Sequence, residues 1–429
     1  MVKINARRIK NLLFFSILYG LLKVSSFSGP LLFANFTTKL DYGVFEYSFA
    51  VGTILALTMD MGLSPSYPLY VLEKKDLNTG YFLSLYFVVS LFLFYTITSL
   101  LYFYSIIISA TYLSVLIALI WQGQLFISSV FKTDGKAFLS ILVDSLFFLL
   151  INLFLFTLFF FKIQYDILKL LALLNFYVVV MLVASVVDIL KNATLTNLSF
   201  VNLKLIRIIS INKDFILNGF AMILIVNLAK IAIEYYFGLS EVADYSATFR
   251  VSFIVLGIYQ VFNIYFFGKI YTLSKDEIDY WFLAVGVLVT FVAVTLFHFF
   301  PLLATLISIL SNLNKTVFAS ICTFAIFWIA SALNEGVLGR EGLLPSSNMT
   351  SFAIVIVFLA SVYIMHLTNT LSPSRIVYLH VSAMFLLIQS QYFWLSRSDI
   401  ILIKTQIYHS FIFLLTLIYL FVIQQGPVL

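Results

Sequence analysis

The stretches Leu12–Asn35, LLFFSILYGLLKVSSFSGPLLFAN, and Val44–Leu72, VFEYSFAVGTILALTMDMGLSPSYPLYVL, decide the fold class of this chain. Each is long and apolar enough to cross the hydrocarbon core of a bilayer, about 30 Å thick, as an α-helix. Each also carries an ionisable residue near its middle, Lys23 in the first and Asp60 in the second. Since a charge at this depth costs about 2.5 to 3.5 kcal/mol on insertion scales, we expect both side chains to face protein or a water-filled cavity.

The composition of the whole chain agrees with this assignment. Of the 429 residues, 62% are hydrophobic and only 10% are charged, whereas a soluble protein has about 25% charged residues. So few charges cannot cover a globular surface in water, which predicts a polytopic membrane protein. The net charge of +6 is what cytoplasmic loops rich in Lys and Arg would give, so it does not indicate a nucleic-acid partner.

Hydropathy divides the chain into about thirteen apolar segments, separated after the sixth by a polar, basic stretch at 191–214. The predicted segments are 12–35, 44–72, 80–104, 106–131, 137–161, 167–190, 215–237, 245–267, 281–303, 315–338, 350–371, 376–395 and 404–424. Because six segments return the chain to the same side, the two halves have the same orientation and fit a parallel repeat of the kind that some transporters use. The predicted fold is an all-α polytopic membrane protein with two six-helix lobes, related by a pseudo-two-fold axis along the membrane normal.

Loop charges predict the topology and the domains. With the N-terminus inside, the inner loops hold most of the Lys and Arg residues, so we expect a cytoplasmic N-terminus. The expected domains are an N-terminal lobe at 1–190, a cytoplasmic basic linker at 191–214, a C-terminal lobe at 215–395 and an additional transmembrane segment at 396–429, giving 12 to 13 transmembrane helices.

Two groups of motifs resemble one known family. The first is Gly20, Pro30, the turn Leu40-Asp-Tyr-Gly-Val-Phe and Met59-Asp-Met-Gly-Leu-Ser; the second is Asn227-Leu-Ala-Lys with the stretch from Tyr236 to Ser246. Both resemble the polysaccharide transporter family, the O-antigen and related lipid-linked oligosaccharide flippases of the multidrug/oligosaccharidyl-lipid/polysaccharide (MOP) exporter superfamily. Two positions depart from the family pattern, Ala229 where an acid is usual and Ala243 where glycine is usual.

The resemblance implies that the first, second, seventh and eighth helices line a central cavity. The embedded charges fall on those helices, and Arg250 would lie near the outer end of the eighth. Lys23, Lys230 and Arg250 would then hold the diphosphate and acidic sugars of the substrate. Asp60 and Glu234 would couple transport to H⁺ or Na⁺. Alternatively, these two acids only neutralise Lys23 and Lys230, since Lys230 and Glu234 are one helical turn apart.

The function that the resemblance implies is transport of an undecaprenyl-diphosphate-linked O-antigen or capsule repeat unit across a bacterial inner membrane. The expected partners are this lipid-linked oligosaccharide, a coupling ion, membrane lipids, and the polysaccharide polymerase with its chain-length machinery. No catalytic residues, cofactor or metal site are expected, because the four His residues lack the spacing of metal ligands and no phosphate-binding glycine loop is present. Two alternatives remain: an O-antigen polymerase, which would need a large outward-facing loop, and a multidrug exporter of the same superfamily, which would prefer an acidic cavity.

Overall fold

The computed structural model describes residues 28–68, 71, 77–192, 205–256, 259, 274–306 and 314–425, together with Gly20, Leu22 and Ser25. Every regular element in these ranges is helical. Eleven of the described helices are long and apolar enough to cross a membrane. Large apolar side chains cover the outward faces of several of them, such as Phe92 and Leu93 on one helix and Phe156 and Phe160 on another. Such continuous apolar surface suits lipid and not water.

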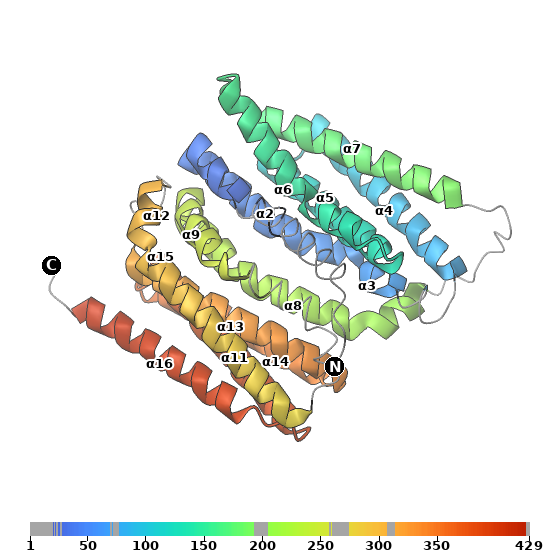
Figure 1. Ribbon diagram of the computed structural model, residues 1–429. Coiled ribbons are helices and arrows are strands. Elements are labelled where there is room, and N and C mark those ends of the chain that lie inside the picture. The colour runs from blue at the N-terminus through green and yellow to red at the C-terminus, as the bar shows by residue number, and fades with distance from the viewer. Residues whose placement is uncertain are drawn as a thin grey trace, which may run out of the picture. The chain divides into compact units, whose positions relative to one another are not determined.

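The chain forms two compact units, Met1–Ile223 and Leu224–Leu429 (Figure 1). In the first unit residues 28–36 are helical, followed by α2 (Lys39–Asp60), α3 (Leu63–Pro68), α4 (Leu77–Phe103), α5 (Ser109–Thr133), α6 (Ala137–Phe160) and α7 (Ile167–Asn192). Helix α8 (Leu205–Phe237) begins in the first unit and ends in the second. The second unit continues with α9 (Leu239–Ser252), α11 (Lys275–His298), α12 (Phe300–Leu306), α13 (Lys315–Arg340), α14 (Leu344–Leu367), α15 (Pro373–Ser396) and α16 (Ile403–Gln425).

Polar side chains fix where several helices begin. Thr38 accepts a hydrogen bond from the backbone N–H of Asp41 at the start of α2, at 3.1 Å. Asn314 accepts one from Thr316 N at the start of α13, at 2.8 Å, and Ser274 with Glu277 forms a capping box at α11. These bonds satisfy backbone N–H donors that have no partner within the helix. An unsatisfied backbone donor is costly in a membrane.

Helix α5 is the centre of the first unit, packed by α2, α3, α4, α6 and α7. Its closest neighbour is α2, and Gly52 makes this approach possible. A Cβ atom at Gly52 would lie 2.7 Å from the backbone oxygen of Ser114 and 2.8 Å from a methyl group of Ile117. Close approach through small residues is the usual way in which helices pack where hydrophobicity gives no driving force.

Helix α13 has the same role in the second unit, packed by α9, α11, α14, α15 and α16. Helix α16 is tied to α11 by polar bonds. The Asp279 carboxylate of α11 accepts from Lys404 N and Thr405 N, both at 3.0 Å, at the start of α16. Tyr408 donates to Thr290 at 2.6 Å further along. The additional segment predicted at 396–429 is therefore packed into the second unit as α16.

Several predicted segments differ from the observed helices. Helix α8 begins at Leu205, inside the linker predicted at 191–214, and the segment predicted at 281–303 is divided between α11 and α12. The segment predicted at 44–72 is interrupted, because Met61 and Gly62 adopt left-handed φ angles of 45° and 76° between α2 and α3. The segment predicted at 245–267 begins earlier, since α9 starts at Leu239 directly after Gly238, whose φ is 87°. Hydropathy missed this start because the first residues of α9 are polar, although several residues of this helix are buried.

Candidate functional site

The five residues predicted to line a substrate or ion site fall in different parts of the structure. Asp60 lies in the first unit, and Lys230, Glu234 and Arg250 lie in the second. Lys23 lies outside the described residues. The structure brings Lys230 and Arg250 to the same hairpin, formed by α8 and α9 around the Gly238 turn.

Lys230 is the buried cation of this hairpin. Its side chain is only 2% exposed, and its ammonium nitrogen lies 5.3 Å from the centre of the Phe249 ring. Lys230 precedes Gly238 by about 12 Å of helix and Phe249 follows Gly238 by about 16 Å, and the contact between the two side chains brings α8 and α9 together at this point. A cation at this distance from an aromatic face is attracted by the ring quadrupole.

Arg250 follows Phe249 and is half-buried in the last turn of α9, where its charge is favourable for the helix dipole. Arg250 lies eleven residues after Leu239, where α9 begins. That Arg250 lies near the outer end of a membrane segment stays a prediction. Glu234 is half-buried on α8, one turn beyond Lys230.

Aromatic and polar side chains form the wall behind Lys230. Phe249 stacks on Phe253 with ring centres 3.8 Å apart. Nearby, His380 is buried, and its Nε2 lies 2.7 Å from the carbonyl oxygen of Ile225, which can only accept. The Nε2 atom therefore carries the hydrogen, and Nδ1 of the neutral ring accepts from the Tyr245 hydroxyl at 3.2 Å. Both ring nitrogens of His380 are therefore used in hydrogen bonds within the second unit.

Asp60 ends α2 and stabilises the start of α3. Its two carboxylate oxygens accept from Ser64, one from Oγ at 2.6 Å and the other from the backbone N–H at 3.3 Å. Helix α5 holds both sides of the interruption, because Gln122 donates to Met59 O at 3.2 Å and Ser129 donates to Ser64 O at 2.6 Å. The first role of Asp60 is thus local, as the cap of an interrupted membrane helix.

A second carboxylate of α2 was not selected from the sequence. Glu46 has no exposed surface and accepts a hydrogen bond from the Tyr42 hydroxyl at 3.3 Å. It lies close after the motif that begins at Leu40, and its place in a predicted membrane helix was the signal that could have identified it. Phe249 carried no comparable signal, because its contact with Lys230 is made only when α8 and α9 fold together.

Metal ligation has no support in the described part of the chain, where no three His, Cys, Asp or Glu side chains gather as a metal ion would require.

Comparison with known proteins gives one informative result. No protein-family profile and no curated protein sequence matches the chain. Among solved structures, it is similar to the inward-facing conformation of a multidrug resistance MATE family transporter of the MOP superfamily. The similarity covers 95% of this chain and 96% of that one, with a TM-score of 0.54 and 13% sequence identity.

The chain has a fold similar to that of this MATE family transporter. This confirms the predicted all-helical, polytopic membrane class. At 13% identity the similarity shows the fold alone, so the substrate has to be argued from the chain's own residues.

Proposed function

We propose that this chain is a MOP-type transporter that moves an undecaprenyl-diphosphate-linked oligosaccharide from the cytoplasmic to the outer leaflet of a bacterial inner membrane. The observation that carries the proposal is Lys230, a buried lysine within the candidate membrane span Ile216–Phe237. Alternating access between two lobes is the usual mechanism of such transporters and requires a site near the midplane of the membrane.

The chemistry of Lys230 favours an anionic substrate. A lysine ammonium can form strong, charge-assisted hydrogen bonds with the oxygens of a diphosphate. Arg250 has a planar guanidinium that can bind phosphate oxygens in pairs, and it directly follows Phe249, whose ring lies beside the Lys230 ammonium. In the proposal Lys23, Lys230 and Arg250 bind the diphosphate and acidic sugars, while the lipid tail stays in the bilayer.

Energy for transport would come from H⁺ or Na⁺. Asp60 and Glu234 are the proposed coupling groups, and the loop charges favour a cytoplasmic N-terminus. The polymerase and its chain-length machinery would act on the product at the outer leaflet.

A multidrug exporter is the second candidate. The similar solved structure is described as a multidrug resistance transporter. Buried acids would suit cationic drugs, and Glu46 and Asp60 on α2 are both buried. An O-antigen polymerase is less well supported, because the similarity to a transporter extends over 95% of the chain.

The experiment that tests the proposal is deletion of the gene in its host, followed by complementation with variants. Under the proposal, deletion removes surface polysaccharide repeats, and single lipid-linked units accumulate on the cytoplasmic leaflet. Lys230→Ala should restore surface polysaccharide about 10- to 100-fold less well than the native chain, the equivalent of one lost charge-assisted bond. Lys230→Arg keeps the charge and should restore more.

Lys213→Ala is the matched control, because Lys213 is an exposed lysine of the same helix α8 and should complement fully. Normal surface polysaccharide in the deletion strain with raised sensitivity to cationic drugs would instead establish the multidrug exporter. Surface molecules that each carry one unpolymerised repeat would establish the polymerase.

A further inference from the structure

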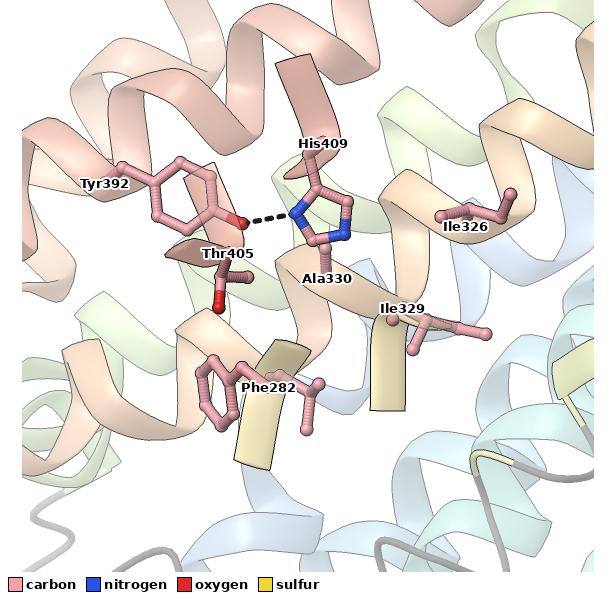
Figure 2. A pocket seen from close by; sticks show the side chains of 9 residues that line it. Phe282, Ile326, Ile329, Ala330, Tyr392, Thr405 and His409 are labelled. Atoms are coloured by element: carbon pink, nitrogen blue, oxygen red, sulfur yellow. Dashed lines mark hydrogen bonds between the residues drawn. The ribbon is translucent and has the colours of Figure 1, made fainter. Parts of the chain in front are cut away.

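Helix α16 is the least buried of the eleven candidate membrane spans, and its packing is uneven along its length. In its first half, His409 Nδ1 lies 2.7 Å from the Tyr392 hydroxyl of α15, as Figure 2 shows. The cavity that remains among α11, α13, α15 and α16 at this level has a volume of about 10 Å³. Since this is about the space of one water molecule, the first half of α16 is closely packed.

A larger groove lies beside the second half of α16. Its walls are formed by the last turns of α11, the first turns of α13 and residues 412–419 of α16. Its volume is about 210 Å³, larger than the apolar cavity of about 150 Å³ that binds benzene in another protein. The lining runs for about 10 Å along α11 and along α16, which is less than half of a hydrocarbon core of about 30 Å. The groove therefore has room for a stretch of hydrocarbon within one leaflet.

The wall of this groove is suited to hydrocarbon. Its three threonine hydroxyls are engaged within the protein, since Thr290 accepts from a tyrosine of α16 at 2.6 Å and Thr323 and Thr416 bond each other at 3.0 Å. Apart from Tyr419, the other lining side chains carry no oxygen or nitrogen. Val294, which lines the groove, is 60% exposed and belongs to a candidate membrane span. The groove is thus continuous with an apolar surface of the kind that lipid chains cover.

A cation stands on α13 at the end of this groove. Lys315, Ala319, Cys322 and Ile326 follow one another at intervals of four, three and four residues, so they form one stripe of the helix. The last three line the groove. Lys315 is exposed at the first residue of α13, about 6 Å of helix before Ala319. At the end of a membrane helix, a lysine on this stripe is placed to pair with a lipid phosphate.

We propose that the groove binds one acyl chain of a phospholipid of the surrounding bilayer, and that Lys315 holds the phosphate of this lipid. The chain fills the space that α11 and α13 leave beside the second half of α16, and it completes the packing of this helix. The proposal does not depend on which substrate is transported. The polyprenyl chain of a substrate and a second copy of this chain are the other occupants that the test distinguishes.

Photochemical attachment of a lipid to the full chain tests the proposal. The protein is reconstituted in nanodiscs of phosphatidylethanolamine and phosphatidylglycerol, with part of the phosphatidylglycerol carrying a diazirine in one acyl chain. Light releases N₂ from the diazirine, and the carbene that remains inserts into a neighbouring C–H or S–H bond, which mass spectrometry locates. The expected site is residues 322–326. The lining residues there, Cys322, Thr323 and Ile326, are at most 6% exposed, so a lipid on the outer surface does not reach them.

Variants that fill the groove should remove this attachment. Ala319→Phe places a ring in the groove and should abolish attachment at residues 322–326. Ala284→Phe is the matched control, because Ala284 is an exposed alanine of α11 that does not line the groove, and it should keep the attachment. If Ala319→Phe does not fold, Val294→Trp and Val287→Trp repeat the comparison at two exposed valines of α11, of which only Val294 lines the groove.

The phosphate contact has a test of its own. Lys315→Gln should lower the yield of attachment about fivefold, the effect of one lysine at an anionic membrane surface. Lys404→Gln, at an exposed lysine in the first turn of α16, should leave the yield unchanged.

Several results would overturn the proposal. They are no attachment at residues 322–326 of the native chain, attachment that survives the groove-filling variants, and an unchanged yield in Lys315→Gln. Loss of attachment when a small amount of undecaprenyl phosphate is added would show that a polyprenyl chain is the occupant. A dimer without bound lipid in native mass spectrometry, together with no attachment in the groove, would show that a second copy of the chain covers it.

Discussion

Each unit is built around one buried helix, yet among the described residues only the second unit buries a cation. In the described part of the first unit the buried charged side chains are Glu46 and Asp60, both on α2 and each hydrogen-bonded to a neighbour on the same chain segment. In the second unit they are Lys230, beside the Phe249 ring, and Asp279, which caps α16. A repeated framework thus carries different chemistry in its two halves, so the repeat positions a site without determining its charge.

The short sequence similarity between the halves shows the same point. Residues 46–48 and 244–246 both read acid, tyrosine, serine, near the starts of α2 and α9. Glu46 is buried, whereas Asp244 is half-buried. Tyr245 is buried and bonds His380, whereas Tyr47 is half-buried. The acid and the tyrosine of the two similar stretches therefore differ in burial, and the sequence similarity does not give them equivalent roles.

The largest expected effect concerns the packing of the first unit. Gly52→Ala should destabilise the protein by about 1 to 3 kcal/mol, because the new Cβ would meet a backbone oxygen of α5 that cannot move alone. The measurement is the midpoint of thermal unfolding in detergent micelles.

Gly219→Ala is the matched control, because the nearest atom to its new Cβ is 3.9 Å away. We expect no loss there, and a gain of up to about 1 kcal/mol from the better helix propensity of alanine. Equal losses of stability for Gly52→Ala and Gly219→Ala would show that the close approach of α2 to α5 does not determine the stability of the first unit.

A medium effect is expected for the buried cation of the second unit. A double-mutant cycle of Lys230→Met and Phe249→Leu should give a coupling energy of about 1 to 2 kcal/mol, because the ammonium and the ring interact where little water screens them. Unfolding midpoints of the four proteins supply the cycle.

Phe87 of the first unit supplies the control, because its ring stacks on Phe126 with ring centres 4.5 Å apart. A second double-mutant cycle, of Lys230→Met and Phe87→Leu, should give no coupling energy. A coupling energy near zero for Lys230 and Phe249 would mean that the buried lysine is stabilised elsewhere, and the contrast between the units would lose its physical basis.

Much of the fold follows from hydropathy, whereas the interruptions and contacts do not. The predicted segments 137–161 and 167–190 closely match α6 and α7. The interruption after Asp60 was missed because 44–72 is largely apolar, although Asp60, Gly62 and Ser64 together resemble a helix stop followed by a cap. Lys230 was selected from the sequence because charged residues are rare within apolar membrane segments. Its ring partner lies 19 positions further along, and no local pattern predicts a contact made by a hairpin.

The smallest expected effect distinguishes a structural from a coupling role for Asp60. Asp60→Asn keeps an acceptor for the Ser64 N–H, so it should cost less than about 1 kcal/mol, whereas Asp60→Ala loses the cap and should cost about 1 kcal/mol or somewhat more. If Asp60 only caps α3, transport by Asp60→Asn keeps its dependence on H⁺ or Na⁺, measured with reconstituted protein at two pH values and two sodium concentrations. If Asp60 binds the coupling ion, Asp60→Asn folds normally but loses that dependence, because the amide cannot take up a proton or neutralise a cation. The second outcome would give the two units a division of labour, with ion coupling on the carboxylates of α2 and anion binding on the lysine of α8.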